Sequence, residues 1–180
     1  MKVLITGSSG LIGTALSKSL TAEGHSAIRL QRQNNDPDSP IWDPDNCLKD
    51  LASVGEIYAV VHLAGENIAD GRWSKTKKNR ILNSRVKGTK LLAEYFANSN
   101  QKPRVIISAS AVGFYGDRGA EIVDEDSKAG NGFLANVCVQ WEDALKVAAK
   151  AGIRVIKVRF GTVLSKEGGA MKKMLLPFKL

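Results

Sequence analysis

Thr6-Gly7-Ser8-Ser9-Gly10-Leu11-Ile12-Gly13 is the stretch that decides the fold. It follows a short apolar run, Val3-Leu4-Ile5, which is typical of a buried parallel strand. Apolar residues then recur at helical spacing as far as Leu20, so the stretch opens a helix. A strand, a glycine turn and a helix in this order predict a nucleotide-binding βα unit, because the amides and dipole at a helix N-terminus favour an anion. The alternative is a turn that only packs the helix and binds no ligand.

The three glycines of this turn have separate expected roles. Gly7 would allow the sharp exit from the strand. Gly10 would let the backbone approach a pyrophosphate, and Gly13 would let the helix pack closely against the strand.

The composition narrows the class of protein. The chain has 180 residues, 43% of them hydrophobic, which suits one globular domain with a substantial core. Its two cysteines, Cys47 and Cys138, lie far apart without C-x-x-C spacing, which argues against a disulfide framework or a zinc site. The first expected strand begins almost at Met1, and no apolar run is long enough to span a membrane. We therefore expect a cytoplasmic protein that binds neither a membrane nor a metal.

The residues after the second expected strand, Ala27–Leu30, bear on the choice of cofactor. NAD-preferring folds place an Asp or Glu there to bind the ribose 2′-hydroxyl. This chain has Gln31 and Arg32 instead, and no carboxylate before Asp36. An arginine can form paired hydrogen bonds with a 2′-phosphate, so NADP (NADPH) is favoured and NAD is the second choice. The alternative is a solvated arginine at the end of a strand.

A second buried strand, Ile57–Leu63, runs into the turn Ala64-Gly65. His62 is expected to be a core histidine rather than a ligand, since no second histidine or cysteine accompanies it. Glu66 is a candidate catalytic carboxylate, although a helix cap is the commoner role for such a residue.

A long helix is expected from Ser74, its N-cap, to about Ser99. Its expected inward stripe is Leu82, Val86, Thr89, Ala93 and Phe96. No acidic residue lies between Asp70 and Glu94, so this segment carries most of the net charge of +8. Nucleic-acid binding is not expected, because only Trp73 is aromatic in the basic stretch. A solvated face is the first interpretation, and the rim of a site for a small anionic substrate is the second.

The next strand, Val105–Ile107, ends in Ser108-Ala109-Ser110. A hydroxyl at the carboxyl end of a parallel strand can reach a substrate carbonyl beside a bound nicotinamide. Ser110 is therefore the candidate catalytic residue, and a serine that merely caps the strand is the alternative.

Several stretches together resemble the atypical, epimerase-like branch of the short-chain dehydrogenase/reductase superfamily, related to the NAD-dependent epimerases and dehydratases. They are Thr6–Gly13, Ala64–Trp73, Ser84–Thr89, Ser108–Asp117 and Gly132–Glu142. The resemblance covers nearly the whole chain. It implies an α/β fold, a Rossmann doubly wound parallel sheet of about six strands in the order 3-2-1-4-5-6 with helices on both faces. Residues 1–180 would form a single NAD(P)-binding domain, without the family's C-terminal substrate-binding part.

The resemblance also aligns Ser110 with the catalytic serine of the extended branch, within a stretch similar to S-S-S-A-x-V-Y-G. The expected cofactor-binding residues are Thr6, Gly7, Ser9, Gly10, Leu11, Ile12, Gly13, Arg32, Leu63, Ala64, Gly65, Ser108 and Ala109.

Two departures from the family pattern concern the chemistry. Arg85 replaces the asparagine of the N-x-x-G-T segment. Counting back from Glu142, Leu134 and Cys138 take the places of the tyrosine and lysine of Y-x-x-x-K. Two hypotheses follow: an NADP-dependent oxidoreductase or sugar-nucleotide epimerase with another proton donor, or a dinucleotide-binding regulatory or interaction protein that has lost the chemistry. The sequence leaves the substrate and the oligomeric state open.

Overall fold

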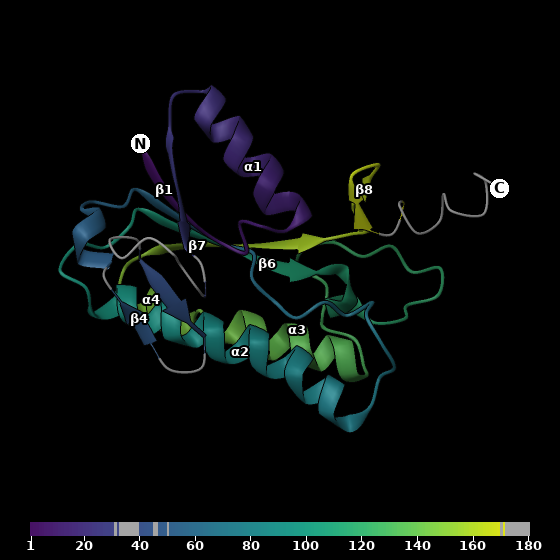
Figure 1. Ribbon diagram of the computed structural model, residues 1–180. Coiled ribbons are helices and arrows are strands. Elements are labelled where there is room, and N and C mark those ends of the chain that lie inside the picture. The colour runs from purple at the N-terminus through teal and green to yellow at the C-terminus, as the bar shows by residue number, and fades with distance from the viewer. Residues whose placement is uncertain (31, 33–39, 45–46, 50, 170, 172–180) are drawn as a thin grey trace.

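The computed structural model describes residues 1–30, 32, 40–44, 47–49, 51–169 and 171 (Figure 1). At its centre is a five-stranded parallel sheet in the order β2-β1-β5-β6-β7. Its strands are β1 (Lys2–Thr6), β2 (Ser26–Leu30), β5 (Ala59–His62), β6 (Val105–Ala111) and β7 (Arg154–Phe160). Within the described part of the chain, this is the expected order 3-2-1-4-5-6 without strand 3. Strand order reverses between β1 and β5, which is where doubly wound sheets bind ligands.

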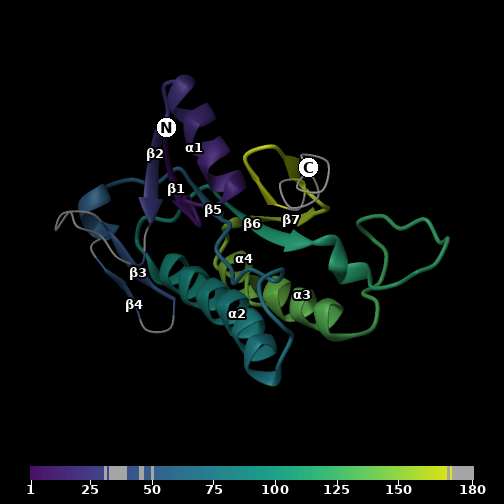
Figure 2. The ribbon, with the colours of Figure 1, turned by 45° about the vertical axis from the view of Figure 1, so that its right-hand side comes forward.

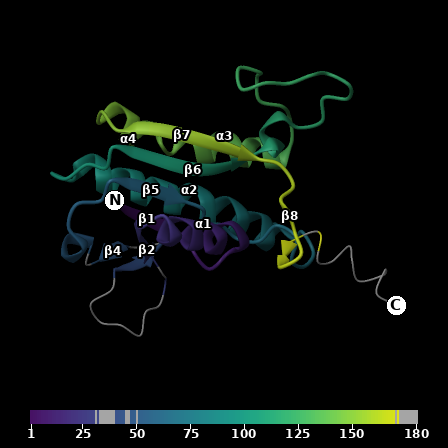
Figure 3. The same cartoon turned by 90° about the horizontal axis from the view of Figure 1, so that it is seen from above.

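Helices cover both faces of the sheet, as expected (Figures 1 and 2). Helix α1 (Leu11–Ala22) lies on one face. Helices α2 (Lys75–Asn98), α3 (Phe133–Asp143) and α4 (Lys146–Lys150) lie on the other. The view from above shows α1 in front of β1 and the later strands following one another toward β7 (Figure 3).

The two faces hold separate apolar clusters, because successive strand residues point to opposite sides. On the α1 side, Ile5 and Val61 pack against Leu16. On the other side, a larger cluster includes Val60 of the sheet and Phe96 of α2. The sheet is thus buried on both sides around the reversal point, as its unbroken apolar strands predict.

The described residues between 41 and 54 form short elements outside the main sheet. Strand β3 (Ile41–Asp43) pairs antiparallel with β4 (Cys47–Lys49) in a separate two-stranded sheet. A 3-10 turn, η1 (Leu51–Val54), follows them. Tertiary packing positions β3: Trp42 is buried, and a Cβ at Gly88 would lie 2.9 Å from its Cζ2 atom. That contact also explains a glycine inside α2.

Helix α2 has the expected limits and a shifted inward stripe. The Ser74 hydroxyl accepts a hydrogen bond from the Lys77 backbone N–H at 3.2 Å, which confirms the cap. Thr89, Ala93 and Phe96 are buried as expected, whereas Leu82 and Val86 are only half-buried and Ile81 and Leu92 fill the core.

A short break around Leu145, which is buried, separates α3 from α4. The remaining elements are a 3-10 turn after β6, η2 (Val112–Tyr115), and a two-residue strand, β8 (Leu164–Ser165). None of the described helices combines the length and apolar character that crossing a bilayer requires.

Candidate functional site

Two pockets meet at the glycine turn, at the carboxyl ends of the strands. The larger has a volume of about 690 Å³ and the smaller about 490 Å³. Both are lined by Gly7, Gly10 and Leu63. A ligand with two bulky ends and a narrow anionic middle matches this arrangement, because the glycine turn forms the junction.

The turn itself is built for close approach. Gly7 has a φ of 67°, and a Cβ there would lie 2.8 Å from the backbone nitrogen of Ala64. A Cβ at Gly13 would lie 2.3 Å from the Gly7 carbonyl oxygen, so α1 packs directly on the turn. Gly10 is the N-cap of α1 and offers no side chain to the amides of the first turn. These amides are left for an anion, as the pyrophosphate prediction requires.

The smaller pocket receives the end of β2 and the turn after β5. Its lining includes Ser8, Ser9, Leu30, Arg32, Trp42, Ala64 and Gly65. Arg32 is exposed and is the charged residue among these described lining residues. The structure therefore brings the proposed cofactor selector to the same pocket as the glycine turn.

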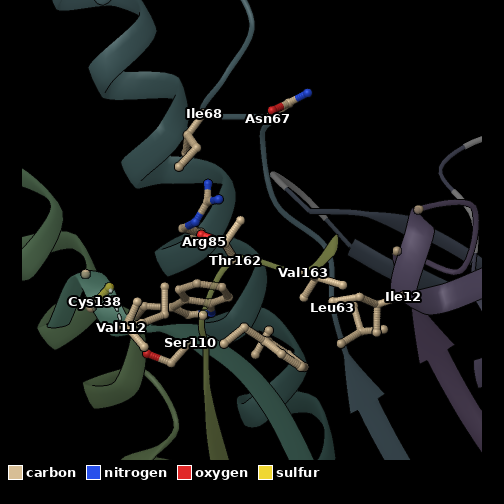
Figure 4. Close-up of a pocket in the computed structure, with 18 of the residues that line it drawn as sticks. Ile12, Leu63, Asn67, Ile68, Arg85, Ser110, Val112, Cys138, Thr162 and Val163 are labelled. Atoms are coloured by element: carbon tan, nitrogen blue, oxygen red, sulfur yellow. Dashed lines mark hydrogen bonds between the residues drawn. The ribbon is translucent and has the colours of Figure 1, made fainter. Parts of the chain in front are cut away.

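The larger pocket lies beyond the ends of β6 and β7 (Figure 4). Leu11, Ile12, Gly13 and Ala109 line it together with Ser110. The wall is otherwise mostly apolar. Its other polar side chains are Asn67, Arg85, Cys138, Trp141 and Thr162.

Ser110 is almost completely buried and is held by a carboxylate. Its hydroxyl donates to Oε1 of Glu142 at 2.7 Å. Nε and Nη2 of Arg159 donate to the two oxygens of the same carboxylate at 2.9 and 3.0 Å, and Nη1 donates to the Tyr115 hydroxyl at 2.9 Å. Burial alone would raise the pKa of Glu142, but the hydrogen bonds from Arg159 and Ser110 outweigh it and hold that pKa below its usual value. Ser110 therefore faces an ionised acceptor.

Leu134 and Cys138 both line the larger pocket, at the places of the family's tyrosine and lysine. The Cys138 thiol lies 3.8 Å from the Ala111 carbonyl oxygen, and burial raises its pKa. A protonated thiol is a weak nucleophile. The structure thus favours a structural role for the buried Cys138.

Two of the expected cofactor residues lie beneath the pockets. Thr6 and Ser108 are completely buried and belong to neither pocket lining. The Thr6 hydroxyl lies 2.7 Å from Nδ1 of His62, and Nε2 of His62 lies 2.9 Å from the Thr89 hydroxyl. His62 is a core residue, as expected, and burial lowers its pKa from 6.5 to about 4.

The expected solvated face of α2 is partly engaged in contacts. Lys77 is buried, with its Nζ 2.7 Å from Oε1 of Glu66, and Arg80 lies 3.6 Å from the same atom. Glu66 thus forms ion pairs with α2 and is not among the described lining residues of the two pockets. Arg85 and Trp141 line the larger pocket but could not be recognised as site residues from the motifs. For Arg85, the sequence signal that bears on this role is the replacement of the family's asparagine.

The comparisons with known proteins agree with this geometry. A model of the NAD dependent epimerase/dehydratase family matches residues 3–177. The chain belongs to this family. The resemblance to the epimerase-like branch is therefore confirmed, and so is the doubly wound fold class.

Relatives in this family are longer than the chain. Epimerase family protein Mb2239 of Mycobacterium bovis is 40% identical over 173 residues, which are 96% of this chain and 57% of that protein. Epimerase family protein SDR39U1 of Homo sapiens is 37% identical over 185 residues, covering 100% of this chain and 60% of that protein. The chain thus spans less than two thirds of the length of either relative.

Solved structures of the family include one with a bound dinucleotide. Human SDR39U1 (isoform 2) with NADPH is similar at a TM-score of 0.86 and 36% identity, over 99% of this chain and 60% of that chain. A nucleoside-diphosphate sugar epimerase from Corynebacterium glutamicum is similar at 0.85 and 43% identity, over 99% of this chain and 38% of that chain. Dinucleotide binding in this family is thus associated with the fold described above.

Proposed function

We propose that this chain binds NADP(H) across the glycine turn, with the adenosine end in the smaller pocket and the nicotinamide end in the larger. The observation that carries this proposal is the meeting of the two pockets at Gly7 and Gly10, over first-turn amides of α1 that no side chain caps. The bound group would supply hydride transfer, and the chain would bind and orient it. The NADPH in the structure of human SDR39U1 supports the assignment.

The preference for NADPH over NADH rests on Arg32. Its side chain lines the smaller pocket beside the glycine turn, where a 2′-phosphate would need a cationic partner. We expect Arg32→Ala to weaken NADPH binding by about 1–3 kcal/mol, roughly 5- to 150-fold, and to leave NADH binding unchanged.

Calorimetric titration of both dinucleotides into the parent and the variant measures this difference. Arg29→Ala is the matched control, because Arg29 is an exposed arginine of the preceding strand β2 and lines neither of these pockets. Equal affinity of the parent for NADPH and NADH would contradict the preference. Failure to bind either would remove the proposed function.

A second candidate, binding without efficient turnover, is favoured by the side chains beside the nicotinamide end. Leu134 cannot donate a proton, the thiol of Cys138 is buried, and the Ser110 proton is directed at Glu142. Reduction of a carbonyl needs a proton donor, and general acid catalysis contributes roughly 10²–10⁴-fold. An oxidoreductase or sugar-nucleotide epimerase would need another proton donor here, whereas a protein that only binds the dinucleotide would not.

NADPH consumption against a panel of carbonyl compounds and sugar nucleotides distinguishes the two. We expect turnover far below the ordinary enzyme rate of roughly 10 s⁻¹, with little change in Ser110→Ala. A rate near that value that disappears in Ser110→Ala would establish the oxidoreductase and refute the binding role.

A further inference from the structure

The charge of the larger pocket is concentrated in one side chain. Among its described lining residues, Arg85 is the sole charged one. The other basic residues of α2 that were expected to form a solvated face or a rim are not part of that lining. Figure 4 shows Arg85 entering the pocket from α2, between Cys138 on one side and Leu63 on the other.

The guanidinium of Arg85 has hydrogen-bond donors to spare. Nη1 donates to the carbonyl oxygens of Glu66 and Ile81, at 3.0 and 3.2 Å. Nε and Nη2 donate to no group in the described part of the chain, and no described carboxylate forms an ion pair with Arg85. The Glu66 carboxylate is engaged by Lys77 instead. Burial lowers the pKa of Arg85, as is usual for a cation whose lost hydration is incompletely replaced.

The same guanidinium packs between an aromatic ring and a glycine. Its carbon Cζ lies 5.1 Å from the centre of the Trp141 ring, which is a cation–π contact. A Cβ at Gly65 would lie 3.2 Å from Cζ, so the absence of a side chain there makes room for Arg85. An arginine that is positioned in this way loses little conformational freedom when it forms a paired hydrogen bond.

We propose that Arg85 binds the carboxylate of a small, largely apolar monoanion in the larger pocket, next to the nicotinamide end of NADP(H). This inference rests on the proposed function. A carboxylate matches the planar fork of a guanidinium and would accept from the donors that have no partner. The body of the ligand is apolar because apolar side chains and glycines form most of the wall.

A sugar nucleotide is a poorer match to the described part of this pocket. A sugar buries many hydroxyl groups, and each one without a partner costs free energy. Few polar side chains of this pocket are suited to bind hydroxyls. In addition to Arg85, they are Ser110, Thr162 and Asn67. A diphosphate would bring two or more negative charges to one guanidinium. One guanidinium balances one negative charge, so a monoanion is the better match.

The test compares two probes of the same shape, hexanoate and hexanamide, by calorimetric titration into the chain saturated with NADPH. We expect hexanoate to bind about tenfold tighter or more, since a charged paired hydrogen bond distinguishes the two. Arg85→Met should abolish the preference, and Arg85→Lys, which keeps the charge without the fork, should retain only part of it. Lys75→Met, which removes an exposed charge from the first turn of α2, should leave it intact.

NADPH titration and thermal melting of each variant come first, so that the two proposals can fail separately. If the parent binds NADPH and takes both probes equally, or neither, the carboxylate site is wrong and the cofactor proposal stands. A preference that survives Arg85→Met also overturns the site. A folded Arg85→Met with about tenfold weaker NADPH binding would reassign the guanidinium to the cofactor. A parent that binds no NADPH refutes both proposals. Should Arg85→Met not fold, the two probes on the parent and on Arg85→Lys decide.

Discussion

His62 should make the stability of the fold depend on pH between neutrality and pH 5. Its imidazole is completely buried between the hydroxyls of Thr6 and Thr89, against the edge of the Trp42 ring at 5.5 Å between centroids. Burial lowers its pKa from 6.5 to about 4, so the folded state keeps the imidazole neutral where the unfolded chain protonates it. The unfolded state binds more protons in this window, so the free energy of unfolding falls as pH falls.

The magnitude follows from the two pKa values. The full difference corresponds to about 3 kcal/mol, and about 2 kcal/mol of it is lost between pH 7 and pH 5. Carboxyl groups contribute little in that window, because the shifted ones, Glu66 and Glu142 among them, have pKa values below the usual range.

Urea unfolding at pH 5, 6 and 7 measures the effect. His62→Gln removes the titrating group, so its free energy of unfolding should be lower at pH 7 but should depend much less on pH. His25→Gln is the control, because His25 lies outside the core. If His62→Gln keeps the slope of the parent, or if the parent has none, the imidazole is not held neutral in the folded state.

Two further predictions concern packing and the ion pair beneath Ser110. Gly13→Ala would place a Cβ 2.3 Å from the Gly7 carbonyl oxygen, so we expect a displaced turn, a lower melting temperature and NADPH binding weakened about tenfold or more; an unchanged melt and titration would contradict this. Arg159→Met leaves the buried Glu142 carboxylate without its main partner and should cost about 3 kcal/mol in urea unfolding at pH 7. The double variant Arg159→Met with Glu142→Gln should recover part of that loss, and no recovery would refute the ion-pair explanation.

The parts of the fold that could be predicted are those with local signals. The glycine turn between β1 and α1, the Ser74 cap of α2 and the apolar strands each carry their information within a few residues. The β3–β4 hairpin could not be predicted in the same way. Its position depends on Trp42 packing against Gly88, a contact between residues far apart in the sequence. The sequence shows a glycine inside α2 but does not identify Trp42 as its partner.

The candidate site also has residues that could be predicted from the sequence and residues that could not. Residues at strand ends could be placed near the pockets, because the carboxyl ends of parallel strands lie at one edge of the sheet. Arg85 could not, since an error of one residue in the expected stripe rotates the predicted face of a helix by about 100°. The stripe on α2 was expected at Leu82 and Val86, and the observed one includes Ile81. With the helix rotated in this way, the arginine four residues after Ile81 faces the pocket rather than solvent.

Ser110 shows why position alone does not determine a role. Its place at the end of β6 is the one expected of a hydroxyl that donates to a substrate carbonyl. However, its hydroxyl already donates to the Glu142 carboxylate, and Arg159 keeps that carboxylate ionised. To donate elsewhere, Ser110 would have to leave a buried, charge-assisted hydrogen bond, which is worth about 1.5–3 kcal/mol. The oxygen of Ser110 can still accept a hydrogen bond while its own proton stays in the hydrogen bond to Glu142. The geometry therefore favours a ligand hydroxyl over a ligand carbonyl at this serine.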